Sequence, residues 1–243
     1  AKAGLKPVFA VYSSFLQRAY DQILHDVCLQ KLPVVFAIDR AGIVGKDGAT
    51  HQGIFDLSYL SSIPNLTIMA PKNKWELSDM LKFAIAADYP VAIRYPRGDA
   101  CDLWREMRAP IVQGRSEVLC EGTDVALFAI GTMVETAWKV KEQLAEREIT
   151  ATVVNARFMA PLDEKEILSA AEKYPLIVTM EENVVSGGFG EHIAALLKEH
   201  EAKVKVLPVA IENRFVKHGD VETLRRVLGI DEKTITDRIC EEL

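Results

Sequence analysis

The chain has 243 residues, 49% of them hydrophobic and 26% charged, which is enough for one large or two ordinary domains with apolar cores. Its net charge of -6 and its lack of a basic cluster argue against a nucleic-acid partner bound through phosphate neutralisation. No apolar run reaches the length needed to cross a membrane, so we expect no membrane partner.

The four cysteines, Cys28, Cys101, Cys120 and Cys240, form no CxxC motif and are not spaced as metal ligands. We therefore expect no metal site in this chain, and four reduced thiols rather than a disulfide pair, as is typical of a cytoplasmic protein. The N-terminal residues lack the apolar segment of a signal peptide, and the chain begins with Ala1 instead of Met. A processed chain and a fragment are both compatible with this start.

Apolar runs and helical patterns alternate along the first part of the chain, to about residue 98. Strands are expected at 7–12, 34–38, 66–70 and 91–95, and helices at 15–29 and 74–87, with a short turn or helix over 55–60. We expect the first of these strands to be buried. The alternation predicts a parallel sheet with crossover helices.

The pattern lapses between about residues 98 and 122, where mixed charges with Pro110 and Gly114 indicate a linker. A second alternating unit follows. Strands are expected at 125–130, 151–155, 176–180 and 204–209, and helices up to 146 and over 161–172, 191–200, 221–228 and 231–242. The sequence therefore predicts an α/β protein with two successive domains, residues 1–110 and 111–243.

The most informative stretch is the loop that follows the second strand, within residues 36–56, FAIDRAGIVGKDGATHQGIFD. It leaves a buried strand and becomes abruptly polar and rich in glycine. Open α/β sheets bind ligands outside the carboxyl ends of their strands, and loops in this position often carry functional residues. We therefore predict that this loop forms part of a functional site.

Asp47 and His51 lie four residues apart in this loop, with Gly48 between them. This spacing can turn both side chains toward one pocket, where a histidine beside a carboxylate can transfer a proton near neutral pH. For Asp47 alone, a solvated surface turn is an equally good interpretation. The polar loop after a buried strand favours a functional role for His51.

Arg40 and Arg97 each come directly after a predicted strand, so both should lie at the same edge of a parallel sheet. Two guanidinium groups that converge there suit a phosphate or carboxylate ligand, although each arginine alone would be an ordinary surface ion pair. Tyr12, after the first strand, strengthens the ligand interpretation. Arg94 lies inside a strand and is expected to be structural.

Phe15 stands in the turn after the first strand, where an aromatic ring can stack on a flat heterocycle, although a core position is the simpler interpretation. The glycine-rich turn at 186–190 precedes a helix whose backbone N–H groups can hold an anion, but an ordinary tight turn is the favoured interpretation. Neither glycine-rich segment matches a dinucleotide-binding or P-loop motif.

Three segments closely resemble the 1-deoxy-D-xylulose-5-phosphate synthase family: residues 12–22 (YSSFLQRAYDQ), 37–53 (AIDRAGIVGKDGATHQG) and 94–98 (RYPRG). In the second half, residues 157–163 and the Glu181-Glu182-Asn183 run resemble the transketolase C-terminal domain. The resemblance implies a thiamin diphosphate pyrimidine-binding, transketolase-like parallel-sheet domain over 1–110, with its start missing. A transketolase C-terminal-like α/β domain would follow over 111–243.

The resemblance also implies an activity. Members of this family are thiamin diphosphate- and Mg²⁺-dependent transferases that join pyruvate to D-glyceraldehyde 3-phosphate, release CO₂ and yield 1-deoxy-D-xylulose 5-phosphate. This is the first step of the methylerythritol phosphate route to isoprenoids, thiamin and pyridoxal. The pyrophosphate and metal site would lie in a missing N-terminal domain, and the glutamate that activates the cofactor would lie in the missing start of the pyrimidine-binding domain. We therefore expect a C-terminal portion of a cytoplasmic, bacterial, homodimeric enzyme that is inactive by itself.

Site residues can be assigned by the same resemblance, motif by motif. Phe15 would stack on the aminopyrimidine ring of the cofactor, and Arg18 would lie near it in the pocket. Tyr12, Arg40 and Arg97 would bind the phosphate of the acceptor.

The two loop residues would have the catalytic roles. By resemblance, Asp47 and His51 would contact the acceptor and the covalent intermediate, with His51 as the candidate for proton transfer. We expect the loop to be mobile, because polar, glycine-rich loops make few buried contacts.

Two other interpretations remain open from the sequence. One is the β chain of a 2-oxoacid dehydrogenase E1, which has the same pair of domains, although residues 39–53 do not resemble that family. The other is a non-catalytic dimerisation module.

Overall fold

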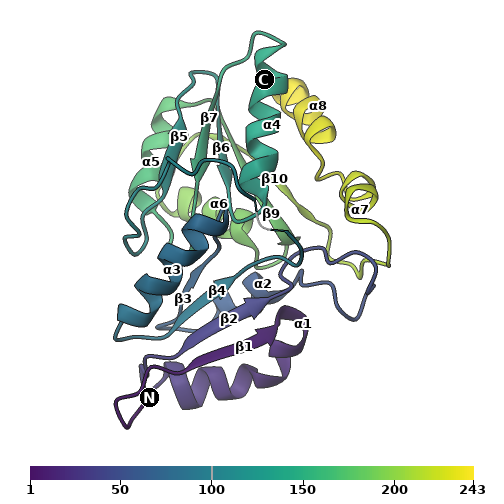
Figure 1. The fold of residues 1–243 in the computed structure, drawn as a ribbon. Coiled ribbons are helices and arrows are strands. Elements are labelled where there is room, and N and C mark those ends of the chain that lie inside the picture. Colours follow the sequence, from purple (N-terminus) through teal and green to yellow (C-terminus); the bar gives the residue numbers. More distant parts are fainter. Residues whose placement is uncertain (100) are drawn as a thin grey trace.

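Two five-stranded sheets form the framework of the protein, whose computed structural model describes residues 1–99 and 101–243. The strand orders are β1-β2-β4-β3-β8 in the first sheet and β10-β9-β6-β7-β5 in the second. Figure 1 shows the first sheet near the N-terminus, in purple and blue, and the second in the teal and green part of the chain. Most neighbouring strands are parallel, which confirms the predicted α/β class with two sheet domains.

The first sheet contains four parallel strands and one antiparallel edge strand. These are β1 (Val8–Tyr12), β2 (Val35–Asp39), β4 (Val91–Arg94), β3 (Thr67–Met69) and the antiparallel β8 (Phe158–Ala160). Its helices are α1 (Ser13–Leu16), α2 (Asp56–Ser61) and α3 (Lys74–Ala86). The helix expected over 15–29 is irregular, with a 3₁₀ turn at Gln17–Ala19 and a π-helical stretch at Gln22–Cys28.

The second sheet has the same plan. Its strands are the parallel β6 (Val125–Ala129), β7 (Ala151–Asn155), β9 (Leu176–Val184) and β10 (Lys205–Ile211), with β5 (Glu117–Cys120) antiparallel at one edge. The helices are α4 (Met133–Ala145), α5 (Glu164–Lys173), α6 (Phe189–Glu199), α7 (Val221–Val227) and α8 (Glu232–Glu242).

Four helices begin where the sequence places an N-cap residue. In each, an Asn or Asp side chain accepts a hydrogen bond from the backbone N–H three residues later, which satisfies one of the free donors of the first turn. The capping residues are Asn73, Asp163, Asp220 and Asp231, before α3, α5, α7 and α8. The predicted starts at 74, 221 and 231 agree with the structure within one residue, whereas α5 begins three residues after the predicted 161, because its N-cap is Asp163.

Two expectations about the strands were wrong, and one strand was missed. The strand β1 is not buried: Val8 and Phe9 are 50% and 47% exposed, because β1 forms the open edge of its sheet. The expected linker contains β5, and β8 was not predicted at all. Each of these two has only three or four residues, too few for a clear alternation of apolar and polar side chains. The strand β8 lies after residue 110 in the sequence but joins the first sheet. The division of the chain at residue 110 therefore stays a prediction.

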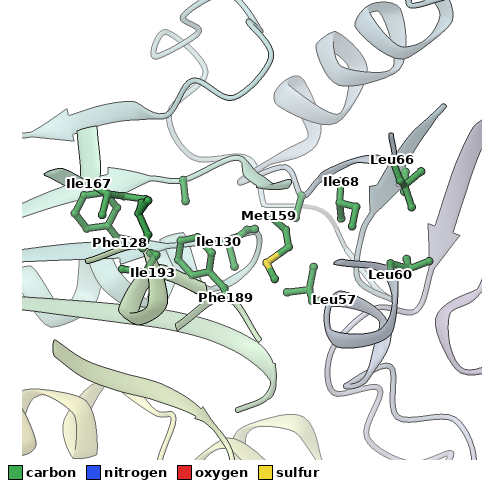
Figure 2. Packing of buried hydrophobic residues seen from close by; sticks show 14 of the residues in the cluster. Leu57, Leu60, Leu66, Ile68, Phe128, Ile130, Met159, Ile167, Phe189 and Ile193 are labelled. Carbon is green, nitrogen blue, oxygen red and sulfur yellow. The ribbon is translucent and has the colours of Figure 1, made fainter. Parts of the chain in front are cut away.

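One apolar cluster extends through both parts of the molecule. Figure 2 shows Leu57, Leu60 and Ile68 of the first part on one side of Met159, and Phe128 and Phe189 of the second part on the other. All of these side chains belong to one buried cluster. Burial of apolar surface is the main stabilising contribution in such an interface, so the two sheets are held in a fixed arrangement.

A buried network of charges also joins the two parts. The guanidinium of Arg157 contacts the carboxylate of Glu76 at 2.7 Å and that of Glu117 at 3.0 Å. Lys72 contacts the same two carboxylates, and the amide of Asn155 donates to Glu76 at 3.0 Å. Two positive and two negative side chains therefore balance one another out of contact with water, which is the condition under which buried charges are tolerated.

Cys28, Cys101, Cys120 and Cys240 are all free thiols in the structure. Within the described part of the chain, no cluster of three or more His, Cys, Asp or Glu side chains could hold a metal ion. None of the helices described is both long and apolar enough to cross a bilayer.

The buried network gives a stability prediction. We expect Arg157→Met to lower the free energy of unfolding by about 3–5 kcal/mol, because it leaves Glu76 and Glu117 with Lys72 as their remaining cation. Urea denaturation would measure the change. As a control, Arg115→Met removes an ion pair with Asp163 at the surface and should cost no more than about 1 kcal/mol. Equal losses in the two variants would contradict this account of the network.

Candidate functional site

The carboxyl ends of β1, β2 and β4 lie side by side at one edge of the first sheet. Tyr12, at the end of β1, pairs with Asp39 at the end of β2, and Ile38 pairs with Arg94 of β4. Arg40 follows β2 directly, in a left-handed backbone conformation with φ of +57°. The convergence of strand ends that the sequence predicted is therefore present in the structure.

An aromatic and cationic cluster occupies this edge. The guanidinium carbon of Arg40 lies 3.7 Å from the centre of the Tyr12 ring, and the same guanidinium pairs with Asp39 at 2.6 Å. The Tyr12 ring stacks on Phe15 with 5.4 Å between ring centres. Close stacking and cation–π contact fix the direction in which these side chains face.

His51 extends the cluster from the far end of the loop. Its ring meets Phe15 edge to face, with 5.3 Å between ring centres, and its Nδ1 lies 2.9 Å from the hydroxyl of Thr50. The guanidinium carbon of Arg18 also lies over the Phe15 ring, 6.0 Å from its centre. Phe15 is thus the point at which the candidate cofactor-binding and catalytic residues meet.

A pocket of about 340 Å³ opens beside Phe15. Ser14 and Arg18 line it from the first turn, Tyr59 from α2, and Phe215 from the second part of the chain. The hydroxyl of Ser14 is buried and has no hydrogen-bond partner among the described residues. Phe15, 38% exposed, presents an aromatic surface. A flat heterocycle with polar ring atoms, such as an aminopyrimidine, therefore fits both features of this pocket.

The loop between Gly42 and Gly53 is closed at its neck. The backbone N–H of each glycine donates to the carbonyl of the other, at 2.6 and 2.7 Å. At Gly53 a Cβ atom would lie 2.1 Å from the carbonyl oxygen of Arg40, so this close approach requires glycine. The neck therefore fixes both ends of the loop next to Arg40.

The inner half of the loop is buried, contrary to expectation. Ile43 and Val44 are core residues, and the Gln52 side chain accepts from the N–H of Val44 at 2.8 Å and donates to the carbonyl of Lys217 at 3.1 Å. The premise that this loop makes few buried contacts was wrong, because its partners come from a distant segment of the sequence. The exposed residues of the loop lie in its outer half, at Lys46, Asp47, Ala49 and Thr50.

Asp47 and Arg97 form an ion pair of 2.5 Å between the loop tip and the segment after β4. Asp47 and His51 therefore have different partners, Arg97 for one and Phe15 with Thr50 for the other. The strand-end arginines also differ, since Arg40 pairs with Asp39 and Arg97 with Asp47. The structure places all of these side chains around one sheet edge, and their assigned roles stay predictions.

Arg94 is structural, as expected, and it supports this loop. It is buried in β4, contacts Asp56 at 2.8 and 3.1 Å, and donates to the carbonyls of Gly53 at 3.2 Å and Glu182 at 3.3 Å. Glu182 was not predicted to be a neighbour of the site. The signal available was an acidic pair, Glu181-Glu182, at the end of an apolar strand.

The glycine-rich turn before α6 is not an open anion site. The carboxylate of Glu181 accepts from the N–H groups of Phe189 and Gly190, at 2.8 and 2.9 Å, and so satisfies the N-terminus of the helix. This confirms the favoured interpretation of a structural turn. Because Glu181 is completely buried, its pKa is raised to about 7 even though these two N–H groups favour the charged form.

Glu181 gives a prediction for pH dependence. The folded protein retains the proton of Glu181 in a range where the unfolded chain, with a pKa of 4.5, has released it. The stability contributed by this group is present below pH 4.5 and is lost as the pH rises to about 7, by about 3 kcal/mol in total.

We expect Glu181→Gln to remove this part of the slope when the free energy of unfolding is measured by urea denaturation from pH 4.5 to 8. The matched control is Glu199→Gln, an exposed glutamate at the other end of the same helix. If the Glu181 variant kept the slope of the unmodified protein, the raised pKa would be disproved.

Comparison with known proteins assigns both parts of the chain. Residues 1–101 match the pyrimidine binding domain of transketolase, and residues 114–235 match the transketolase C-terminal domain. The chain is 54% identical over 243 residues to a protein named 1-deoxy-D-xylulose-5-phosphate synthase from Lachnoclostridium phytofermentans, and 51% identical to one from Caldanaerobacter subterraneus. These alignments cover 100% and 99% of this chain and 39% of each relative, so the chain spans well under half of their length.

Solved structures show the same architecture. A structure described as a split gene transketolase, inactive beta4 tetramer, is 28% identical, with a TM-score of 0.89 over 99% of this chain and 77% of its own. Transketolase from Campylobacter jejuni is 20% identical, with a TM-score of 0.75 over 97% of this chain and 35% of its own, which shows a common fold.

Proposed function

Because this chain belongs to the transketolase family, we propose that it is part of a thiamin diphosphate-dependent transferase, 1-deoxy-D-xylulose-5-phosphate synthase. This enzyme condenses pyruvate with D-glyceraldehyde 3-phosphate and releases CO₂. Relatives with that name, about half identical over the whole chain, support the proposal. The observation that carries it is the gathering of Tyr12, Arg40, Asp47 and Arg97 at one sheet edge, beside the pocket at Phe15.

The acceptor phosphate is proposed to bind between the strand-end arginines. Arg40 and Arg97 present partly exposed guanidinium groups, each now paired with a single carboxylate. A phosphate dianion competes well for such groups because it accepts forked, charge-assisted hydrogen bonds. Tyr12 would complete the phosphate site, since its ring already orients Arg40. Binding would also release Asp47 from Arg97 and make it available to the acceptor.

The pocket at Phe15 is the proposed position of the aminopyrimidine of thiamin diphosphate. When bound, the cofactor supplies a nucleophilic carbon and accepts the electrons that decarboxylation of pyruvate releases. Phe15 would stack on the aminopyrimidine, the hydroxyl of Ser14 would gain a partner, and Arg18 would line the same pocket. The pyrophosphate and Mg²⁺ are proposed to bind in the N-terminal region of the relatives, which this chain does not cover.

His51 is the proposed proton-transfer residue. Its Nδ1 is engaged with the hydroxyl of Thr50, which leaves Nε2 as the ring nitrogen that can exchange a proton with the acceptor. The edge contact with Phe15 holds the ring next to the proposed cofactor pocket. Asp47 and His51 would thus act on the acceptor from the same loop, whose neck is fixed beside Arg40.

We further propose that the chain alone is inactive and that the complete enzyme is a cytoplasmic homodimer. The solved structure that covers almost all of this chain is described as an inactive tetramer of one chain of a split gene transketolase. No comparison favours the β chain of a 2-oxoacid dehydrogenase E1, or a module that lacks a catalytic role in the complete enzyme.

Complementation tests this proposal. Residues 1–243 alone should form no 1-deoxy-D-xylulose 5-phosphate from pyruvate and D-glyceraldehyde 3-phosphate. A fusion to the N-terminal region of the Lachnoclostridium phytofermentans relative should form it, because the two halves of the cofactor site are then together. The unmodified relative is the positive control. Turnover by the isolated chain would refute the proposal that the chain alone is inactive. A folded but inactive fusion would refute the proposed reaction.

The phosphate role of Arg97 is testable in the same fusion. Arg97→Ala should raise the KM for D-glyceraldehyde 3-phosphate by about tenfold or more, with a smaller effect on kcat, because one charged contact to phosphate is lost. Steady-state kinetics with the phosphorylated acceptor and with D-glyceraldehyde would measure the discrimination. Arg108→Ala, which removes an exposed arginine paired with Asp79, is the control. An unchanged KM with normal phosphate discrimination would exclude the role.

A further inference from the structure

The neck of the loop at residues 42–53 rests directly on a side chain of the second part of the molecule. A Cβ atom on Gly42 would lie 2.1 Å from Oε2 of Glu182, so only glycine allows this contact. Gly42 also has φ of +79°, which glycine adopts without strain. The neck of the loop therefore packs against the carboxylate of Glu182.

Two groups hold this carboxylate in place. Glu182 is only 2% exposed, and its Oε1 accepts from Nε of Arg225 at 2.8 Å, while Oε2 accepts from the hydroxyl of Thr132 at 3.2 Å. The negative charge of Glu182 raises the pKa of Arg225, so the guanidinium remains charged. Removing one partner of a buried ion pair leaves the other charge uncompensated, and it then moves toward water or takes up a proton.

The segment that leads into α7 holds the rest of the loop. The carbonyl of Lys217 accepts from Gln52, and the N–H of Gly219 donates to the carbonyl of Gly45 at 3.3 Å. Figure 1 shows the loop after β2 reaching toward this segment, which continues into the yellow α7. Arg225 lies on α7, so one short piece of the second part of the chain contacts the middle of the loop directly and reaches the neck through Glu182.

We propose that Arg225 is a positioning residue for the loop at residues 42–53. Through Glu182 it fixes the neck at Gly42, and so sets the place of Asp47 and His51 relative to the acceptor. No local sequence pattern indicates this role, because Arg225 and the loop lie in different parts of the chain. The inference rests on the proposed function for its effect on turnover, but the effect on loop structure is independent of it.

A rival explanation is direct contact between Arg225 and the ligand. Arg225 and Arg97 both line a second pocket, of about 210 Å³, so Arg225 is close enough to the proposed phosphate site for this to need a test. Positioning predicts a change in the loop before any ligand is added. Direct binding predicts a change in kinetics with an unaltered loop.

Hydrogen–deuterium exchange of the fusion without ligands separates these explanations. In Arg225→Met, peptides that cover residues 42–53 should exchange about fivefold faster or more, because the neck hydrogen bonds open more often. Arg225→Lys, which keeps a charge opposite Glu182, should give an intermediate rate. Arg226→Met, which removes the exposed arginine next to it on α7, should leave the rate unchanged. Peptides from β6 and β7 should keep their protection in all three variants.

The kinetics of the same variants should change in parallel with the exchange of residues 42–53. In Arg225→Met, kcat/KM for D-glyceraldehyde 3-phosphate should fall about tenfold, with the KM for pyruvate unchanged, and Arg225→Lys should recover part of the loss. Unaltered exchange of residues 42–53 in Arg225→Met would overturn the inference, whatever the kinetics. If Arg225→Met also speeds exchange in β6 and β7, the test is made with Arg225→Lys instead. Unaltered exchange of residues 42–53 in that variant would then overturn the inference. An inactive unmodified fusion would count against the proposed function alone, since the exchange measurement does not need turnover.

Discussion

The buried guanidinium of Arg94 is the interaction on which the arrangement of the site depends. It lies inside β4 and binds Asp56 of α2, the carbonyl of Gly53 in the loop neck and the carbonyl of Glu182 in β9. Burial alone would disfavour its charge, but Asp56 and the acidic residues of β9 keep its pKa raised. One cation thus joins the first sheet, the loop and the second sheet at the carboxyl ends of their strands.

This construction explains how a polar, glycine-rich loop is held in place. The close contacts at Gly42 and Gly53 exclude any side chain, while Gln52 and the segment around Lys217 and Gly219 hold the loop from the other side. At the exposed tip Asp47 forms an ion pair with Arg97, and at the far end of the loop His51 contacts Phe15. Loops that present functional groups from such a rigid frame need little rearrangement to bind a ligand.

The sequence predicted most of this from local signals. Long apolar runs, helical spacing of apolar residues and the polar loop after β2 are readable within a few residues, and they located the sheets, most of the helices and the strand-end arginines. The short β8, the exposure of β1 and the Arg225–Glu182 pair depend on residues far apart in the chain, which no local pattern records. The buried inner half of the loop was missed for the same reason.

We propose that the strand-end arginines of this chain hold the phosphate of the acceptor. A crystal structure of the complete enzyme with D-glyceraldehyde 3-phosphate would test it most directly. We expect the phosphate between Arg40 and Arg97, with the ion pair between Arg97 and Asp47 broken. A phosphate bound elsewhere, with that ion pair intact, would contradict it.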